Sequence, residues 1–314
     1  MKNDYLICPH CHNNLQKIEH AYQCVDCKKK YPFLHGIPEF LSSKDSFYEG
    51  KFVASIPYSS QFKDVARHLF LRRLRFLKTS LQKIKKKKPL QILDLACGGG
   101  HELLTKYGAV VGVDISLASL QGAQKYYDHV VRADAEHLPF TDESFDVVIA
   151  MDFFGHIQKQ SKKIILSEIH RVLKKGGSTI QYIEAEGSNS MQNFAQRHID
   201  LYQKYFIDRE GHVGLEPPMV ILERFYGSGL IPVGSIGAYK SWLKPPGEIS
   251  GRFGSEYAEL YPWLLPFVFL DSVICAISPL RFIGTAISEV TTSLIDRLFP
   301  FQKSDGVFLM ATKV

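Results

Sequence analysis

Four cysteines near the amino terminus have the spacing of a metal site. Cys8 and Cys11 form one C-x2-C knuckle, CPHC, and Cys24 and Cys27 form a second, CVDC. Two facing knuckles direct four thiolates to one point, which is the ligand set of a closed structural zinc site. Four thiolates already complete a tetrahedral shell, so we do not expect ligands among the nearby histidines His10, His12 and His20. We predict a Zn²⁺ ion held by the four cysteines.

A second group of residues surrounds the glycine loop in LDLACGGGHELL. An apolar run ends at Asp94, and Gly98, Gly99 and Gly100 follow, so the backbone there can approach a ligand closely. Dinucleotide sites carry G-x-G-x-x-G and P-loops carry a lysine after the glycines, and neither pattern is present. An acid beside the loop repels phosphate and attracts a cation. The pattern therefore favours a cationic ligand over a phosphate ester.

The elements that position this loop alternate from residue 90 onward. LQILDLAC, AVVGVDIS, HVVRADA, FDVVIAMDF and STIQYIEAEG have the patterns of strands, whereas HELLTKYG, LASLQGAQKYY and KKIILSEIHRVLKKGG have those of helices. This order predicts a doubly wound α/β sheet with its ligand site at the carboxyl ends of the strands. We expect a zinc ribbon at 1–42, a helical connector at 43–89, an α/β domain at 90–238 and 306–314, and an apolar helical insertion at 239–305 before the last strand.

The connector has an apolar stripe at helical spacing, which comprises Val65, Leu69, Leu74, Leu77, Leu81 and Ile84. The lysine run 85–88 that follows favours a solvated helix end, and a nucleic-acid patch is the alternative.

The glycine loop and its acid resemble motif I of class I S-adenosylmethionine-dependent methyltransferases of the type 11 kind. Three further matches follow in order: Asp114 in VVGVDIS, Asp134 with Ala135 in RADA, and RVLKKGG, whose Gly176 and Gly177 are expected to end a helix. The resemblance implies a Rossmann-like methyltransferase sheet with S-adenosylmethionine as cofactor. It implies that Asp114 accepts from both ribose hydroxyls and that Asp134 contacts the adenine. The predicted cofactor-binding residues are Asp94, Ala96, Gly98, Gly100, Asp114, Ile115, Asp134, Ala135 and Met151.

The methyl acceptor is constrained less well. Methyltransferases that modify adenine or glutamine amino groups carry Asn-Pro-Pro-aromatic after the fourth strand, whereas this chain has MDFFGHI. This difference argues against those amino groups and leaves hydroxyl groups, activated carbon atoms or other nitrogen atoms as possible methyl acceptors. The candidate general bases are His156, His198 and His212, with a packing role as the alternative for His156. Glu184 and Glu186 at the end of the fifth strand could also face the substrate.

The insertion contains YPWLLPFVFLDSVICAISPLRFIGTAI, which is apolar but interrupted by Pro266, Asp271, Pro279 and Arg281. A membrane-spanning helix needs about twenty apolar residues, so this segment is a poor one. We expect a buried helical lid or a homodimer face. The alternative is a hydrophobic lid that admits a lipid-like acceptor or rests on a membrane surface.

Composition leaves the function classes open. The net charge of +6 is compatible with a nucleic-acid or anionic-membrane partner but is also common in enzymes without one. The first twenty residues lack an apolar signal region, so we expect a cytoplasmic protein. Our first hypothesis is a methyltransferase for oxygen or carbon of a hydrophobic small molecule or a lipid- or sugar-linked acceptor. The alternatives are a zinc-ribbon ribosomal RNA methyltransferase and a non-catalytic, cofactor-binding partner protein.

Overall fold

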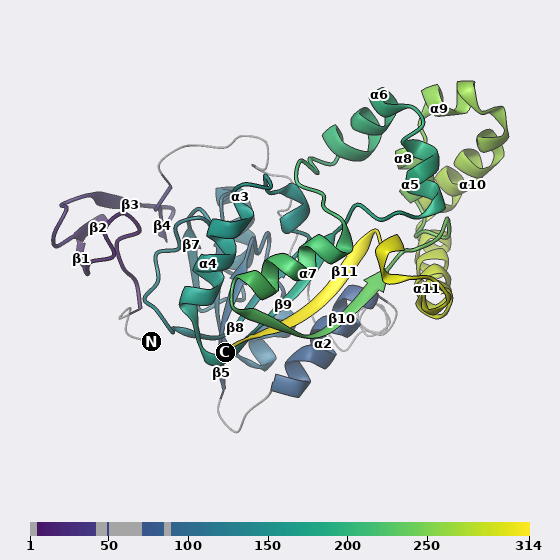
Figure 1. Ribbon diagram of the computed structural model, residues 1–314. Coiled ribbons are helices and arrows are strands. Elements are labelled where there is room, and N and C mark those ends of the chain that lie inside the picture. The colour runs from purple at the N-terminus through teal and green to yellow at the C-terminus, as the bar shows by residue number, and fades with distance from the viewer. Residues whose placement is uncertain (1–4, 42–48, 50–70, 85–88) are drawn as a thin grey trace.

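The computed structural model describes residues 5–41, 49, 71–84 and 89–314, and it contains a four-stranded and a seven-stranded sheet (Figure 1). The small sheet is antiparallel in the order β1-β2-β3-β4, with strands Leu15–Ile18, Ala21–Cys24, Lys30–Leu34 and Ile37–Pro38. It lies beside the edge strand β7 (His129–Arg132) of the large sheet. Ile37 and Phe40 are buried, and the amide of Phe40 donates to the carbonyl of Arg132 at 2.8 Å. Phe33 packs instead within the small sheet, against Tyr22.

The large sheet has the order β10-β11-β9-β8-β5-β6-β7. Its remaining strands are β5 (Leu90–Leu95), β6 (Gly108–Asp114), β8 (Phe145–Met151), β9 (Leu173–Glu184), β10 (Leu230–Ala238) and β11 (Gly306–Lys313). Strands β5 to β9 are mutually parallel, and β11 runs antiparallel to both β9 and β10. The predicted α/β doubly wound, Rossmann-like methyltransferase fold is therefore confirmed.

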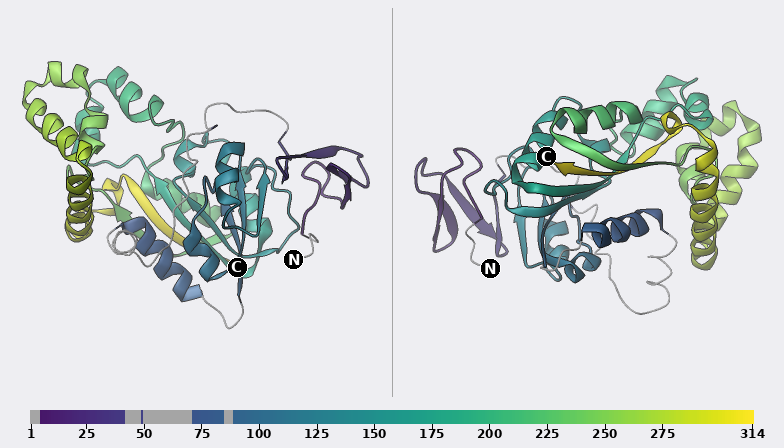
Figure 2. Two further views of the ribbon diagram at one scale, coloured as in Figure 1. Left: turned by 180° about the vertical axis from the view of Figure 1, so that it is seen from behind. Right: turned by 60° about the horizontal axis from the view of Figure 1, so that its bottom comes forward.

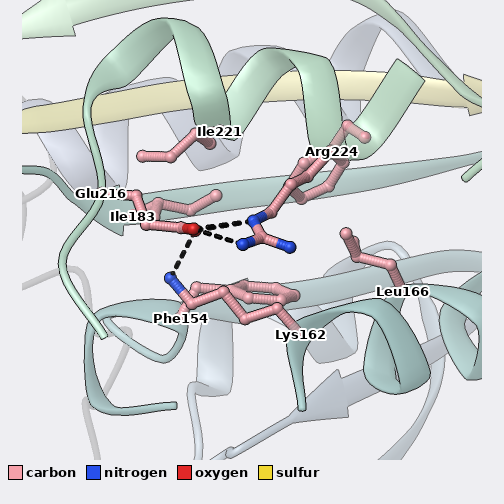
Figure 3. Close-up of a pocket in the computed structure, with 8 residues that line it drawn as sticks. Phe154, Lys162, Leu166, Ile183, Glu216, Ile221 and Arg224 are labelled. Carbon is pink, nitrogen blue, oxygen red and sulfur yellow. Dashed lines mark hydrogen bonds and ion pairs between the residues drawn. The ribbon is translucent and has the colours of Figure 1, made fainter. Parts of the chain in front are cut away.

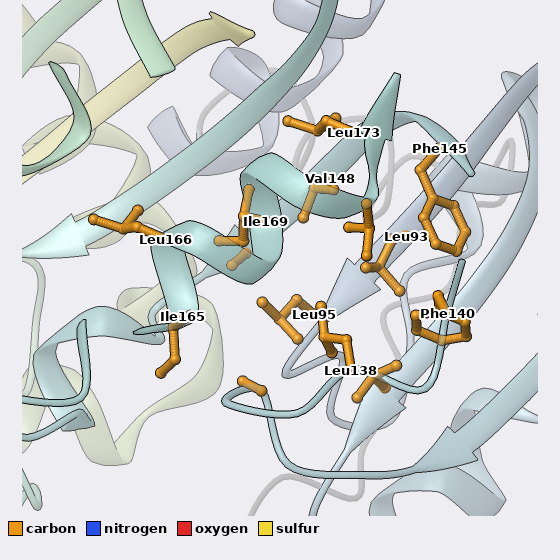
Figure 4. Packing of buried hydrophobic residues seen from close by; sticks show 14 of the residues in the cluster. Leu93, Leu95, Leu138, Phe140, Phe145, Val148, Ile165, Leu166, Ile169 and Leu173 are labelled. Carbon is orange, nitrogen blue, oxygen red and sulfur yellow. The ribbon is translucent and has the colours of Figure 1, made fainter. Parts of the chain in front are cut away.

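Alternate residues of the central strands pack on opposite faces of the sheet. Leu93 and Leu95 join a cluster with helices α4 (Lys162–Val172) and α7 (Pro218–Gly227) (Figure 4). Leu90 and Ile92 join a second cluster with α2 (Arg72–Ile84) and α3 (Leu117–Ala123). Figure 2 shows α2 and α7 on opposite sides of the sheet. Of the predicted connector stripe, Leu74, Leu77, Leu81 and Ile84 lie on α2, whereas Val65, Leu69 and the lysine run 85–88 fall outside the described residues.

Two local predictions are wrong. HELLTKYG forms only a 3₁₀ helix, η1 (Glu102–Lys106), because the chain reaches β6 within a few residues. The glycines of RVLKKGG do not end α4: that helix ends at Val172, and the buried Leu173 already has extended backbone and begins β9. Gly176 instead makes a turn with φ of 69° inside the first part of the strand.

The insertion leaves the sheet at the edge where the ligand site is expected. Because β10 is antiparallel to β11 and β11 to β9, β10 ends at the same edge as β5, β6, β8 and β9. The insertion forms α8 (Glu248–Arg252), α9 (Ser255–Leu260), η4 (Pro262–Leu264), α10 (Leu265–Ala276), α11 (Ser278–Ile295), η5 (Asp296–Leu298) and η6 (Phe301–Lys303). Three segments after β9 gather beside it in Figure 1, namely α5 (Ser190–Ala195), α6 (Ile199–Tyr202) and the π-helix η3 (Gln203–Asp208).

The expectation of a buried helical lid does not hold for the outer part of the insertion, whereas the homodimer face stays a prediction. None of the α10 side chains is buried, and Phe269 is 70% and Leu298 81% exposed. No single helix in the described ranges has the length and apolarity to span a membrane. The segments Pro262–Ala276 and Ser278–Leu298 reach that threshold only as a pair, which is bent by 115°.

Candidate functional site

The glycine loop turns sharply at the carboxyl end of β5. Ala96, Gly98 and Gly100 have φ values of 55°, 52° and 84°, a region that residues with a side chain rarely adopt. A Cβ on Gly100 would lie 2.9 Å from the Cα of Ala123 in α3, so this position also needs glycine for packing. The loop therefore presents backbone rather than side chains to the sheet edge.

Two acids lie against this loop, of which Asp94 is buried and Asp114 partly buried. Asp114, at the end of β6, accepts hydrogen bonds from the amides of Gly98 and Ser116, both at 2.8 Å. Asp94 accepts from the hydroxyl of Tyr127 at 2.5 Å. Burial raises the pKa of Asp94 to about 7, against the lowering effect of that hydrogen bond, and Asp114 raises it further. A nearby cation would favour the ionised form of Asp94.

The other predicted cofactor residues line the adjoining strand ends. The carbonyl of Ile115 accepts from Nε of Arg132 at 2.7 Å. Asp134 is exposed and accepts from the amide of Glu136, Ala135 is buried, and Met151 is partly buried at the end of β8. All nine residues thus lie in the glycine loop, at the carboxyl ends of β5, β6 and β8, or just after β6 and β7, while their contacts with a cofactor stay a prediction.

Sequence reasoning missed Glu49. Its carboxylate accepts from the amide of Ala118 at 2.9 Å, at the start of α3, and lies 3.4 Å from a guanidinium nitrogen of Arg132. Arg132 also pairs with Glu39 at 2.9 Å. No periodicity or motif marks Glu49, because its role depends on a contact with residues far along the chain.

The structure brings two of the three candidate bases together. His156 ends the 3₁₀ helix η2 (Phe154–His156), and its ring centroid lies 4.8 Å from that of His212. Glu184, at the end of β9, lies 4.0 Å from Nε2 of His212. His198 does not belong to this group: its Nε2 lies 2.9 Å from the hydroxyl of Tyr261, in an aromatic cluster between α5, η3 and the insertion. The prediction for His198 as a base thus has no support from its surroundings.

A buried ion triad fixes the segment that carries His212. Glu216 accepts from Nζ of Lys162 at 3.0 Å and from Nε of Arg224 at 2.8 Å (Figure 3). Lys162 also donates to the carbonyl of Gly214, and the amide of Gly214 donates to the carbonyl of Gly155 at 3.0 Å. The narrow cavity beside this triad has room for little more than one water molecule, so it is not an acceptor pocket.

A second acid and its partner arginine were also missed. Asp152 follows β8 with a φ of 59°, and its carboxylate pairs with Arg73 of α2 at 2.8 Å. The Arg73 guanidinium lies over the ring of Tyr182 at 4.2 Å. A non-glycine residue at positive φ is strained, and such strain is concentrated at functional sites. The signal for Asp152 was its position at a strand end.

The four cysteines of the small sheet form one cluster. The Cys11 and Cys24 sulfurs are 3.3 Å apart and those of Cys8 and Cys27 are 3.7 Å apart, and all four lie within 4.8 Å of one another. Zn–S bonds of about 2.3 Å in a tetrahedron separate the sulfurs by about 3.8 Å, so the cluster fits Zn²⁺.

Comparisons with known proteins find similarity in part of the large domain. Residues 93–181 match the family described as a methyltransferase domain. The chain is 32% identical over 137 residues to the ubiquinone/menaquinone biosynthesis C-methyltransferase of Wigglesworthia glossinidia brevipalpis, covering 39% of this chain and 53% of that protein. It is 35% identical over 113 residues to the phthiotriol/phenolphthiotriol dimycocerosates methyltransferase of Mycobacterium leprae, covering 32% and 40%.

Among solved structures, the phosphoethanolamine N-methyltransferase 2 of Haemonchus contortus in complex with S-adenosyl-L-methionine covers 90% of this chain and 62% of its own, with a TM-score of 0.49 and 19% identity. The chain spans about half or less of the length of the curated relatives it matches. The similarity to a methyltransferase domain thus covers residues 93–181, which lie within strands β5 to β9 of the large sheet.

Proposed function

We propose that this chain transfers the methyl group of S-adenosylmethionine to oxygen or carbon of a hydrophobic, lipid-like acceptor. One observation carries the choice of acceptor: the apolar insertion leaves β10 at the same sheet edge as the glycine loop, Asp114 and Glu184. An acceptor bound between the sheet edge and the insertion would meet apolar side chains on one side and the methyl donor on the other.

The residues at the sheet edge fit the proposed cofactor. A buried acid at Asp94 suits the ammonium group of the methionine part, and a carboxylate at Asp114 suits two adjacent ribose hydroxyls. Asp114 already accepts from two backbone amides, so its carboxylate is fixed in orientation before a ligand arrives. The sulfonium supplies an electrophilic methyl group, and the protein's contribution is then the alignment of the acceptor with it.

The side chains around the insertion support an apolar acceptor. Phe194, Tyr257 and Phe253 pack at the centre of the aromatic cluster, and Trp242 stacks on Phe253 at 5.5 Å. Beyond the cluster, α10 and α11 expose large apolar side chains: Leu265, Phe267, Phe269, Leu270, Leu280, Phe282, Ile283, Ile287 and Leu294. Exposed apolar side chains in such number mark a contact with a partner protein, a ligand or a membrane, and we propose a lipid or membrane contact here. Two relatives that are named for ubiquinone/menaquinone biosynthesis and for phthiotriol/phenolphthiotriol dimycocerosates support the proposal of a hydrophobic acceptor.

We propose that His156 and His212 assist a hydroxyl acceptor. Burial, and then the neighbouring His156, lower the pKa of His212 to about 4, so its imidazole is neutral near pH 7. His212 and His156 lie with Glu184 at the sheet edge where the acceptor is proposed to bind.

We also propose a cytoplasmic location in which the α10–α11 surface rests on a membrane without crossing it.

The proposal is tested by methyl transfer from labelled S-adenosylmethionine to three classes of acceptor: quinols that lack the methyl group, lipid extracts in vesicles, and RNA. We expect label in the lipid or quinol fraction. Phe269→Asp should lower both vesicle co-sedimentation and the rate with lipid acceptors at least several-fold. Ser272→Asp, which adds the same charge to an exposed polar position of α10, is the matched control. Transfer to RNA alone would reject the acceptor class while retaining the methyltransferase.

A further inference from the structure

His156, Glu184 and His212 have the geometry of a second metal site, separate from the cysteine cluster. One ligand atom from each lies within 4.8 Å of the other two. A metal ion bonded at about 2.1 Å to nitrogen and oxygen separates its ligand atoms by about 3.0 to 3.4 Å. The 4.0 Å between His212 Nε2 and a Glu184 oxygen is therefore within about 1 Å of a coordinating arrangement.

The His156 imidazole is held by a backbone group, as is usual for metal ligands. Nδ1 of His156 lies 3.1 Å from the carbonyl of Gly211. A carbonyl can only accept, so Nδ1 carries the proton and Nε2 carries the lone pair. The backbone amide of His212 donates to the carbonyl of Ile207 at 2.9 Å, which fixes the backbone that carries this ring. The His156 ring is held by Nδ1, which orients its Nε2 toward a ligand.

Glu184 supplies the oxygen ligand from a buried position. Its side chain is 14% exposed, and its Oε1 is the oxygen that lies 4.0 Å from His212 Nε2. Within the described residues the other oxygen, Oε2, is buried without a hydrogen-bond partner and lies against Gly155. A buried carboxylate oxygen without a partner is costly, and a cation is one way to satisfy it. A Cβ on Gly155 would lie 2.9 Å from Oε2, so glycine at 155 lets the carboxylate lie directly against η2.

Close packing brings the His212 segment to the other two residues. A Cβ on Gly214 would lie 1.7 Å from the carbonyl oxygen of Ile157, so only glycine allows this approach. Gly214 is also anchored by Gly155 and Lys162. Three segments distant in sequence, after β8, after β9 and before α7, are thus fixed around one point before any ion binds.

We propose that His156, Glu184 and His212 bind a divalent transition-metal ion, with Zn²⁺ or Fe²⁺ as the class that two imidazoles and one carboxylate suit. Three protein ligands leave coordination positions for water or substrate, as in catalytic rather than structural sites. At this sheet edge the ion would act as a Lewis acid that lowers the pKa of an acceptor hydroxyl. This last role rests on the proposed function, whereas ion binding itself does not.

The test uses the full chain with Zn²⁺ retained by the four cysteines and titrates Co²⁺ as the probe. We expect one further equivalent of Co²⁺, with weak visible bands and no sulfur-to-metal charge-transfer band. His212→Ala and Glu184→Gln should each weaken this binding at least tenfold. His137→Ala, which removes an exposed histidine outside the group, should leave it unchanged.

Circular dichroism checks the fold of each variant, and calorimetry with S-adenosylhomocysteine checks the cofactor site independently. Absence of the further equivalent in folded wild-type chain, or equal binding in the His212→Ala chain, would overturn the metal proposal. Loss of S-adenosylhomocysteine binding in the wild-type chain would overturn the methyltransferase proposal without affecting the Co²⁺ result.

Discussion

Replacement of Glu216 by glutamine removes the only anion from the triad that it forms with Lys162 and Arg224. The Lys162 side chain is 2% and that of Glu216 4% exposed, whereas Arg224 is 30% exposed. In Glu216→Gln the ammonium group of Lys162 stays buried beside the carbonyl of Gly214, but the charge that compensates it is gone. The segment that carries His212 loses an anchor at the same time.

The expected loss of stability is large. Removal of one partner from a buried ion pair costs about 3 to 5 kcal/mol, because an uncompensated charge remains. Arg224 can turn toward solvent, so we place the loss near the lower figure, at about 3 kcal/mol. For a domain of this size each kcal/mol changes the melting temperature by about 2 to 4 °C, which gives a decrease of about 6 to 12 °C.

The dependence of the folding stability on pH tests independently whether the Glu216 carboxylate is stabilising. Burial by itself raises the pKa of Glu216, but the hydrogen bonds from Arg224 and Lys162 outweigh it and hold that pKa below the ordinary 4.5. The stabilisation is therefore fully present above about pH 4.5 and is lost as the pH falls through the lower folded value. The wild-type and Glu216→Gln chains should converge in stability in acid.

Thermal and urea denaturation at pH 7 and pH 4, followed by circular dichroism, make the comparison. The double variant Lys162→Met with Glu216→Leu is the matched control, since removal of both buried charges costs much less than removal of one. If Glu216→Gln melted within about 1 °C of wild type at pH 7, or the double variant were the less stable of the two, the triad would not have the structural role assigned to it.

Three further predictions concern the metal cluster and the glycine loop. Native mass spectrometry should show one Zn²⁺ lost on Cys24→Ser, and because the small sheet depends on the metal, proteolysis should then cleave within residues 5–41 while the large domain persists. Because burial raises the pKa of Asp94 from 3.8 to about 7, the folded chain retains a proton that the unfolded chain has lost. The free energy of unfolding should fall by on the order of 4 kcal/mol between pH 4 and pH 8 relative to Asp94→Asn; parallel curves would refute this. Gly100→Ala should weaken S-adenosylhomocysteine binding at least tenfold, since its Cβ meets Ala123, and unchanged affinity would show that the loop adapts.

Short sequence motifs predicted the strands and the cysteine cluster, because residues close together in the sequence determine these features. The strands around Asp94 and Asp114 and the four-cysteine cluster follow from short motifs or apolar runs. The helix at 101–108 was predicted by composition, but tight connection to β6 allowed only one 3₁₀ segment.

Contacts between distant segments were not predictable in the same way. Nothing in the sequence pairs His156 with His212 or directs Glu49 to α3, because those contacts depend on how loops pack after the sheet has formed. The insertion was expected to be buried because it is apolar, yet Phe269 and its neighbours lie on the surface. An apolar composition indicates that side chains favour removal from water. It does not specify whether other residues of the same chain or a binding partner cover them.

The most direct test of the account is calorimetric titration of the zinc-loaded chain with S-adenosylhomocysteine, beside Asp114→Ala. Two hydrogen bonds to a charged carboxylate are worth about 1.5 to 3 kcal/mol each, so the variant should lose at least a hundredfold in affinity while keeping its fold. Micromolar binding by the wild type and its loss in Asp114→Ala is the predicted result. Absence of binding by folded wild-type chain, or equal binding by both chains, would contradict the assignment of the glycine loop and Asp114 to the methyl donor.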